Sequence, residues 1–238
     1  MVANLSFPGG ANLGIWSSID DLWAVELASK NLDFIILDLE HGFRDFSRFS
    51  AAFLSLSGRK KVLVRLRSHE DPWLQSILDL GATELVVPQI EGPNQVEIFI
   101  KKISWPPNGS RGFHPRSRVQ PPLQGGEESQ IRVIPIIEKR SALDSCSEIL
   151  MVDGVSGVYF GAFDLSVQLE LPGPSDSEIS THLASVAEKC KFAGKDFLSM
   201  PLNQDQVDLA VAAGAKSFVT GIDIQLLCAG VRQVTGRV

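Results

Sequence analysis

The chain has 238 residues, of which 44% are hydrophobic and 21% are charged, and its formal net charge is −6. This composition is typical of a globular protein with a sizeable core, and no basic patch favours nucleic acid as a partner. No apolar run approaches the roughly 18 residues of a membrane span, and the first residues lack the regions of a signal peptide. The three cysteines are widely spaced and match no zinc pattern, which fits a reducing compartment. We therefore expect a cytoplasmic protein that binds neither nucleic acid nor membrane.

Short apolar runs alternate with amphipathic segments through the first hundred residues. The apolar runs are nearly continuous, as in buried parallel strands, and lie at 12–17, 34–42, 61–68 and 84–90. The amphipathic segments predict helices at 22–28, 46–56, 70–82 and 93–103.

The second and third expected strands carry polar residues that a core strand does not need. The second ends in Asp38, Glu40 and His41. Asp38 and His41 can meet if the chain turns, either to orient the imidazole for proton transfer or as a loop hydrogen bond without a catalytic part. Arg65 interrupts the third strand, where a buried guanidinium must be paired or must face a polar site. Its planar donors suit an anion or enolate clamp, and a structural ion pair is the alternative.

The stretch 104–130 departs from this alternation. It is rich in proline and glycine, has no periodicity, and is long enough to be a functional lid, an interface segment or a disordered region. Arg111, His114, Arg116 and Arg118 give it positive charge inside an acidic protein. That charge would suit an anionic substrate, and a solvated surface loop is the alternative.

The alternation then resumes to the end of the chain. Further strands are expected at 132–138, 154–161, 196–201 and 217–222, and further helices at 142–150, 176–193, 207–211 and 223–231. Eight strands that alternate with helices, without a linker, predict one (β/α)8 TIM barrel that occupies 1–238 as a single domain.

Two acidic residues follow the fifth and sixth expected strands, namely Glu138 and Asp164. They are either helix-capping acids or a pair of ligands at the mouth of the barrel. The ends of strands 2, 3, 5 and 6 ring the same mouth, so Glu40, His41, Arg65, Glu138 and Asp164 are expected to converge. Two carboxylates suit Mg²⁺ or Mn²⁺, because hard cations prefer oxygen ligands and leave positions for water and substrate. A 2-oxo acid could chelate such a cation, and Arg65 would help to stabilise its enolate.

The chain resembles the HpcH/HpaI aldolase family, the class II (metal-dependent) pyruvate aldolases. The matching segments cover most of the chain in the family's order, namely FIILDLEHG, VLVRLRSHEDPWLQSILDLGATELVVPQI, WPPNGSRGF, IIEKRSALDSCSEILMVDGVSGVYFGAFDLS and GAKSFVTGID. The resemblance implies a (β/α)8 barrel that forms a homo-oligomer, usually a hexamer, with a helix swapped between subunits. It also implies a divalent metal, Mg²⁺ or Mn²⁺ with Co²⁺ as a further candidate.

The resemblance also implies roles for the residues at the mouth. It implies that Glu138 and Asp164 bind the metal and that Arg65 holds the pyruvate enolate. It implies that His41, oriented by Asp38, handles the proton on the aldehyde oxygen.

Further roles follow from the same resemblance. Glu40 would lie in the shell of metal-bound water, and Gly161 and the backbone at Phe163 would meet the pyruvate carboxylate. Arg111 matches the arginine at the start of the family's active-site loop.

Three departures bear on substrate choice. Ile136 stands where members often have glutamine, and Phe163 replaces a smaller or hydroxyl-bearing residue. The segment after DLS is VQLELPG in place of a small, glycine-containing one, which would put the bulkier Gln168 and Glu170 near the mouth.

These features predict a metal-dependent lyase that cleaves a 4-hydroxy-2-oxo acid to pyruvate and an aldehyde, or runs the reverse condensation. A second hypothesis keeps the enolate and changes its partner, as in a biosynthetic synthase or an oxaloacetate decarboxylase. A third is a non-catalytic family member that binds a small acid.

Overall fold

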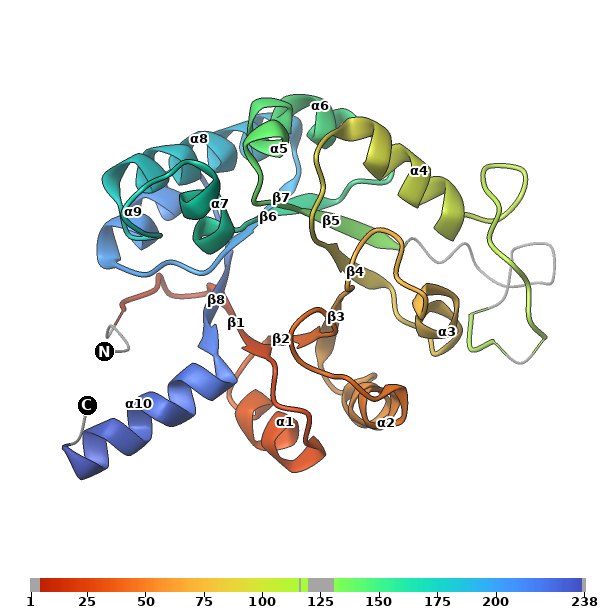
Figure 1. The fold of residues 1–238 in the computed structure, drawn as a ribbon, viewed down its shortest axis with the longest axis horizontal. Helices are drawn as coiled ribbons and strands as arrows, with labels where there is room; N and C mark the ends of the chain where they lie inside the picture. The colour runs from red at the N-terminus through yellow and green to blue at the C-terminus, as the bar shows by residue number, and fades with distance from the viewer. Residues whose placement is uncertain (1–4, 116, 120–130, 237–238) are drawn as a thin grey trace.

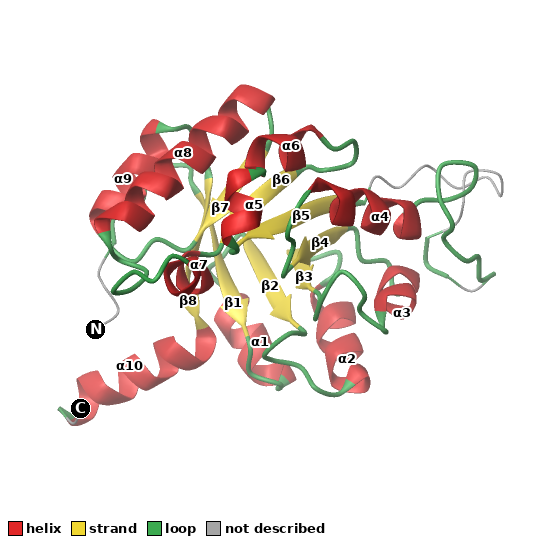
Figure 2. Ribbon diagram, turned by 45° about the horizontal axis from the view of Figure 1, so that its top comes forward, coloured by secondary structure: helices red, strands yellow, loops and turns green. Residues whose placement is uncertain are grey.

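The computed structural model describes residues 5–115, 117–119 and 131–236. In this part of the chain, parallel strands pair in sequence order and close into one barrel, with β1 beside both β2 and β8 (Figures 1 and 2). The strands are β1 (Asn12–Ser17), β2 (Phe34–Asp38), β3 (Lys61–Arg65), β4 (Glu84–Val87), β5 (Arg132–Ile137), β6 (Gly157–Phe160), β7 (Asp196–Ser199) and β8 (Ser217–Ile222). The predicted (β/α)8 barrel is confirmed.

Helices surround the barrel, and most lie where the sequence predicts them. They are α1 (Leu22–Ser29), α2 (Phe46–Leu56), α3 (Leu74–Asp79), α4 (Pro93–Ile103), α5 (Arg140–Asp144), α6 (Cys146–Met151), α7 (Ala162–Gln168), α8 (Ser177–Ala193), α9 (Gln204–Ala212) and α10 (Asp223–Thr235). Three differences matter: α3 is shorter than predicted, the expected helix 142–150 is divided into α5 and α6, and α7 was not predicted. The described parts of the stretch 104–130 contain no helix or strand, while Arg116 and residues 120–130 lie outside the described residues.

Each strand points alternate side chains inward and outward, as a pleated backbone requires. In β2, Phe34 and Ile36 point into the barrel, whereas Ile35 and Leu37 face the surrounding helices. The barrel interior is a packed apolar cluster, not a pore, and is formed by Trp16, Phe34, Ile36, Leu63, Val86, Ile134, Ile136, Tyr159, Leu198, Met200 and Val219. Full burial of each such side chain stabilises the fold by roughly 1.5–3 kcal/mol before entropy is counted.

The last helix, α10, differs from the others because it extends away from the barrel (Figure 1). Asp223 is its one buried residue among those described. That carboxylate accepts hydrogen bonds from the Ser17 hydroxyl at 2.9 Å and the Ile19 N–H at 3.0 Å. The base of α10 is therefore tied to the end of β1, while the rest of the helix projects outward.

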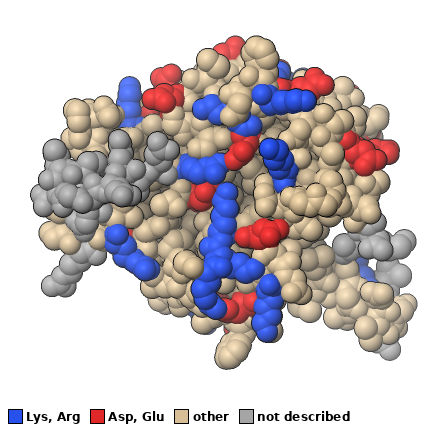
Figure 3. Space-filling view, turned by 180° about the vertical axis from the view of Figure 1, so that it is seen from behind, with Lys and Arg blue, Asp and Glu red and all other residues tan. Residues whose placement is uncertain are grey.

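The surface carries charges of both signs. On the face behind that of Figure 1, lysine and arginine side chains form a column with aspartate and glutamate beside it (Figure 3). Within the described residues, no helix is long and apolar enough to cross a membrane.

Candidate active site

The candidate site lies at the carboxyl ends of the strands, where the inward-facing positions change from apolar to charged. Two positions after the last apolar inward-facing residues of β2, β3 and β5 come Asp38, Arg65 and Glu138. Because strand side chains alternate, all three point toward the mouth of the barrel. The pairing of β2 with β3 sets Asp38 directly beside Arg65.

Arg65 is held by two carboxylates. Its Nε and Nη2 donate to Oδ1 and Oδ2 of Asp38 at 2.8 and 2.6 Å, and its Nη1 lies 2.8 Å from Oε2 of Glu40. The guanidinium also lies 4.5 Å from the centre of the Trp16 ring. Burial lowers the pKa of Arg65, but the hydrogen bonds to Asp38 and the negative charges of Asp38, Glu40 and Glu138 together outweigh burial and raise that pKa above its ordinary value. Three of the five guanidinium N–H donors serve these contacts, so two are left for a substrate oxygen.

Glu138 is a buried carboxylate, with only 6% of its surface exposed. Its Oε1 accepts the backbone N–H of Gln89 at 2.6 Å. Burial raises the pKa of Glu138 to about 7, and the negative charges of Glu40 and Asp164 push that pKa in the same direction. The carboxylate is therefore placed where a bound cation would stabilise its charged form.

Arg65, Glu138 and Asp164 line one cavity of about 170 Å³. Asp164 itself is exposed and lies in the first turn of α7. Most other lining residues are apolar or aromatic and include Trp16, Ile136, Tyr159, Phe160, Phe163, Met200 and Ile222. The sequence brings together an arginine, two carboxylates and an apolar wall in a space that suits a small molecule.

Neither Glu138 nor Asp164 is an N-cap, although Asp164 does lie in the first turn of α7, where the helix dipole favours a carboxylate. The N-cap of α5 is Lys139 and that of α7 is Gly161, and neither helix has a side-chain cap in the described part of the chain. Glu138 instead accepts a hydrogen bond from β4's end, and Asp164 faces the cavity.

His41 lies at the mouth of the cavity with 72% of its side chain exposed. Asp38 reaches it through the backbone, because Oδ1 of Asp38 accepts the N–H groups of Glu40 at 2.9 Å and His41 at 3.3 Å. The His41 Nε2 lies 4.0 Å from Oε2 of Glu40. Asp38 thus fixes the backbone at His41 and makes no contact with its imidazole among the described hydrogen bonds. The two oxygens of Asp38 also accept hydrogen bonds from Arg65.

Gly161 leaves room that a side chain would fill. A Cβ at this position would lie 2.7 Å from Cβ of Glu138, 2.9 Å from Cγ2 of Ile136 and 3.3 Å from Oε2 of Glu138. Ile136 is buried and Phe163 is partly exposed, and both line the cavity. The structure therefore brings Gly161, Ile136 and Phe163 to the site.

The structure does not bring Arg111 to this cavity. Arg111 precedes β5 in the connection from α4, so it lies at the opposite end of the barrel and lines a cavity of about 1120 Å³ with Arg132 and Lys195. Its guanidinium lies 4.2 Å from the centre of the Trp105 ring. Within its own chain, Arg111 is remote from the site that the resemblance implies for it.

The residues of the site that were not predicted include Trp16, Gln89 and Tyr159. Trp16 and Tyr159 pack against each other with ring centres 4.9 Å apart. Both residues lie in apolar strands, so the sequence pattern places them in the core. The structure confirms this, and it also shows that both line the cavity. Gln89 had a readable signal, because it is a polar residue directly after a buried strand.

The residues present fit a hard divalent cation. No group of three or more histidine, cysteine or acidic residues is gathered as a metal site within the described residues. Glu138 and Asp164 would therefore supply two oxygen ligands and leave the other positions to water and substrate, as Mg²⁺ and Mn²⁺ commonly do. The observation that fits a cation here is geometric, because Asp164 and buried Glu138 line the same cavity and both present carboxylate oxygens.

Known proteins resemble this chain over nearly its whole length. A hydroxypyruvate/pyruvate aldolase of Roseovarius nubinhibens is 28% identical over 239 residues, covering 96% of this chain and 93% of the relative. A 4-hydroxy-2-oxovalerate aldolase of Rhodococcus jostii is 28% identical over 228 residues, covering 92% and 88%. Among solved structures, a citrate synthase has a TM-score of 0.84 and 24% identity, covering 96% of this chain and 93% of that one.

A family model matches residues 14–229, which contain every residue of the candidate site described above. The chain is a member of the HpcH/HpaI aldolase/citrate lyase family.

Proposed function

We propose that the chain is a divalent-metal-dependent aldolase that cleaves a 4-hydroxy-2-oxo acid to pyruvate and an aldehyde, or runs the reverse condensation. The observation that carries this proposal is the convergence of Arg65, Glu138 and Asp164 on one small cavity. The names of the two aldolase relatives support the same substrate class. In either direction the reaction makes or breaks one carbon–carbon bond, so the enzyme is a lyase.

Glu138 and Asp164 are the proposed ligands of Mg²⁺ or Mn²⁺, with Co²⁺ as a further candidate. A bound cation of this kind acts as a Lewis acid that stabilises negative charge on the keto oxygen of the substrate. The chain contributes one carboxylate directly after β5 and another in the first turn of α7. Glu40, close enough to Glu138 to raise its pKa, is proposed to lie near water in this shell.

Arg65 is the proposed clamp for the enolate. When the bond between C3 and C4 breaks, its electrons move to C3 and C2, and charge develops on the C2 oxygen. The two N–H donors that Asp38 and Glu40 leave unused can meet that oxygen. Because both carboxylates fix the guanidinium before substrate arrives, little reorganisation is needed during the reaction.

His41 is the proposed proton carrier at the aldehyde end. In cleavage it takes the proton from the C4 hydroxyl as that carbon becomes an aldehyde, and in condensation it returns the proton. Its exposed ring at the cavity mouth supports this role. The substrate carboxylate is proposed to meet the backbone at Phe163 and Asp164, whose N–H groups lie in the first turn of α7, beside the open space at Gly161.

The decisive test measures pyruvate release from 4-hydroxy-2-oxo acids. Full chelation with EDTA should abolish turnover, and Mg²⁺, Mn²⁺ or Co²⁺ should restore it. Glu138→Ala should abolish turnover at any metal concentration. Turnover that survives chelation or Glu138→Ala would refute the proposal.

The second candidate function changes the partner of the same enolate, as in a synthase or an oxaloacetate decarboxylase. Ile136 favours this second candidate, because an apolar side chain lines the cavity where members of the family often have an amide. A screen of keto-acid donors against aldehydes and acyl acceptors separates the two. Calorimetric titration with Mn²⁺ separates both from a non-catalytic member, which would bind no metal even with pyruvate present.

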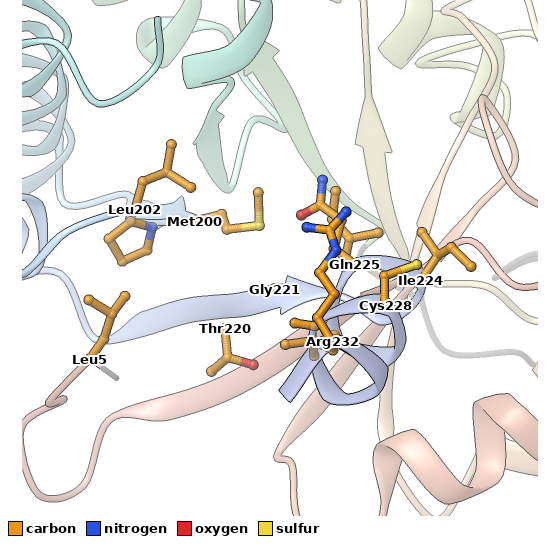
Figure 4. A pocket seen from close by; sticks show the side chains of 13 residues that line it. Leu5, Met200, Leu202, Thr220, Gly221, Ile224, Gln225, Cys228 and Arg232 are labelled. Carbon is orange, nitrogen blue, oxygen red and sulfur yellow. The ribbon is translucent and has the colours of Figure 1, made fainter. Parts of the chain in front are cut away.

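We also propose a cytoplasmic homo-oligomer, with a hexamer as the expected size. Exposed apolar side chains on α10, namely Ile224, Leu227 and Val231, support a contact between copies. A cavity of about 440 Å³ lies between α10 and the ends of β7 and β8 (Figure 4). Light scattering should give a mass several times 25.9 kDa, and Leu227→Glu should lower it. The stretch 104–130 is a second candidate for this interface.

A further inference from the structure

Gln89 adjoins both halves of the candidate site, namely the guanidinium of Arg65 with its carboxylates and the carboxylate of Glu138. β4 pairs with β3 on one side and with β5 on the other. Arg65 ends β3, and Glu138 directly follows β5. Gln89 lies two residues beyond the end of β4, between these two groups.

Gln89 makes a hydrogen bond to each half. Its backbone N–H donates to Oε1 of Glu138 at 2.6 Å. Its side-chain amide nitrogen donates to Oε1 of Glu40 at 2.7 Å, while the other oxygen of Glu40 lies 2.8 Å from Nη1 of Arg65. One residue therefore connects the carboxylate proposed to bind the metal with the carboxylate that holds the guanidinium.

The backbone at Gln89 is in the left-handed region, with φ of 59°. Side chains rarely adopt this conformation, and glycine adopts it without steric cost. Glycine would also supply the N–H that Glu138 accepts. A glutamine here accepts conformational strain that glycine would avoid, which indicates that the amide itself has a role.

We infer that Gln89 is a positioning residue. It holds Glu40, and through Glu40 also Arg65, in a fixed position relative to Glu138. This inference rests on the proposed function. With its first oxygen bound by the amide, Glu40 can present only its second oxygen to Nη1 of Arg65. The guanidinium then keeps its remaining donors aimed into the cavity. Without the amide, Glu40 can rotate, and the guanidinium of Arg65 is then held in a fixed position by Asp38 but no longer by Glu40.

The test compares the wild-type chain with Gln89→Gly, which keeps the N–H, relieves the left-handed strain and removes the amide together with the two methylene groups that carry it. The first readout is the exchange of pyruvate methyl protons with solvent, which reports enolate formation without an aldehyde. The second is the Mn²⁺ affinity of the metal-free protein, measured by calorimetry. Glu170→Gly is the matched control, because Glu170 is the other described non-glycine residue with positive φ, at 58°, and does not line the cavity.

We expect proton exchange in Gln89→Gly to slow roughly tenfold through kcat, the usual effect of losing one hydrogen bond to a charged group. Mn²⁺ affinity should stay within about twofold, because the N–H to Glu138 is retained. In a Glu40→Ala background, Gln89→Gly should have no further effect, since its amide then has no acceptor. Glu170→Gly should leave exchange unchanged.

Two results would overturn the inference. One is wild-type exchange in Gln89→Gly, and the other is an equal additional loss when Gln89→Gly is combined with Glu40→Ala. A wild-type chain that binds Mn²⁺ and exchanges pyruvate protons, beside an unaffected Gln89→Gly, would reject the inference alone. A wild-type chain that does neither would reject the proposed function, and the inference with it.

Discussion

The two ends of the barrel use charged residues in opposite ways. At the amino ends of the strands, Lys61 and Arg132 pair with Glu84, and Arg132 also pairs with Asp196, with side chains that are partly or largely exposed. At the carboxyl ends, Arg65 and Glu138 are buried. Ion pairs in water contribute little to stability, whereas buried charges need fixed partners and have perturbed pKa values. Among charges that the described strands carry or that directly follow them, the buried ones lie at the end where the proposed chemistry needs them, whereas Arg111, which is also buried, belongs to the connection from α4.

The largest test of this comparison replaces one arginine at each end by lysine. Arg65→Lys keeps the charge but loses the planar fork that binds Asp38 and Glu40. We expect pyruvate proton exchange to fall by roughly 10²–10³, the usual effect of removing an aligned donor from developing negative charge. Arg132→Lys, at the other end, should leave exchange within about twofold of wild type. Similar losses in both variants would contradict the distinction between the ends.

The second test fills the space beside Glu138. In Gly161→Ala the new Cβ would lie 2.7 Å from Cβ of Glu138, so Glu138 or Ile136 must move. We expect Mn²⁺ affinity to fall at least tenfold and the free energy of unfolding to drop by about 1–3 kcal/mol. Gly173→Ala is the control, since a Cβ there would meet nothing within 4 Å. Unchanged Mn²⁺ affinity in Gly161→Ala, measured by calorimetry, would contradict the expectation that the new Cβ displaces Glu138 from the metal site.

The sequence predicts the barrel better than the detailed contacts of its site. Asp38, Arg65 and Glu138 can be identified from the sequence. Each is a polar residue at an inward-facing position, two residues after the last apolar one, at the end of an otherwise apolar strand. The placement of Arg111 is not readable in this way. Its place in the chain is the readable signal, because a segment that leads from a helix into the next strand must approach the amino end of the barrel.

Two further features depend on three-dimensional contact and could not be read from spacing. The spacing of Asp38 and His41 suggested a contact with the imidazole, but the pairing of β2 with β3 gives that carboxylate to Arg65. The helix α7 has only seven residues, too few for a periodic signal. Asp164 therefore appeared to follow a strand directly, whereas it lies in the first turn of a helix.

A third test uses the raised pKa of Glu138, about 7, which burial mainly causes. The metal-free fold binds this proton more tightly than the unfolded chain, so the stability that the proton contributes is full below about 4.5 and is lost as pH rises through about 7. A cation competes with the same proton. Mn²⁺ affinity should therefore fall about tenfold for each pH unit below 7 and level off above it.

Glu40→Gln sharpens this test. Glu40 helps to raise the pKa of Glu138 by its negative charge, so its removal should move the midpoint of the Mn²⁺ affinity curve to lower pH. Calorimetry at several pH values would measure both curves. An affinity that does not vary between pH 5 and 8 would contradict the role of a buried, protonated Glu138.

The smallest expected effect lies at the amino end of the barrel. Nζ of Lys61 is 3.5 Å from Oε1 of Glu84, and 47% of the lysine side chain is exposed. Lys61→Gln should change the free energy of urea-induced unfolding by only about 0.5 kcal/mol, and added salt should shrink the difference further, because water and ions screen such a pair. A loss above about 2 kcal/mol would mean that Glu84 is effectively buried there. In that case both ends of the barrel would depend on fixed charge pairs, and burial of charge would no longer single out the end with the proposed site.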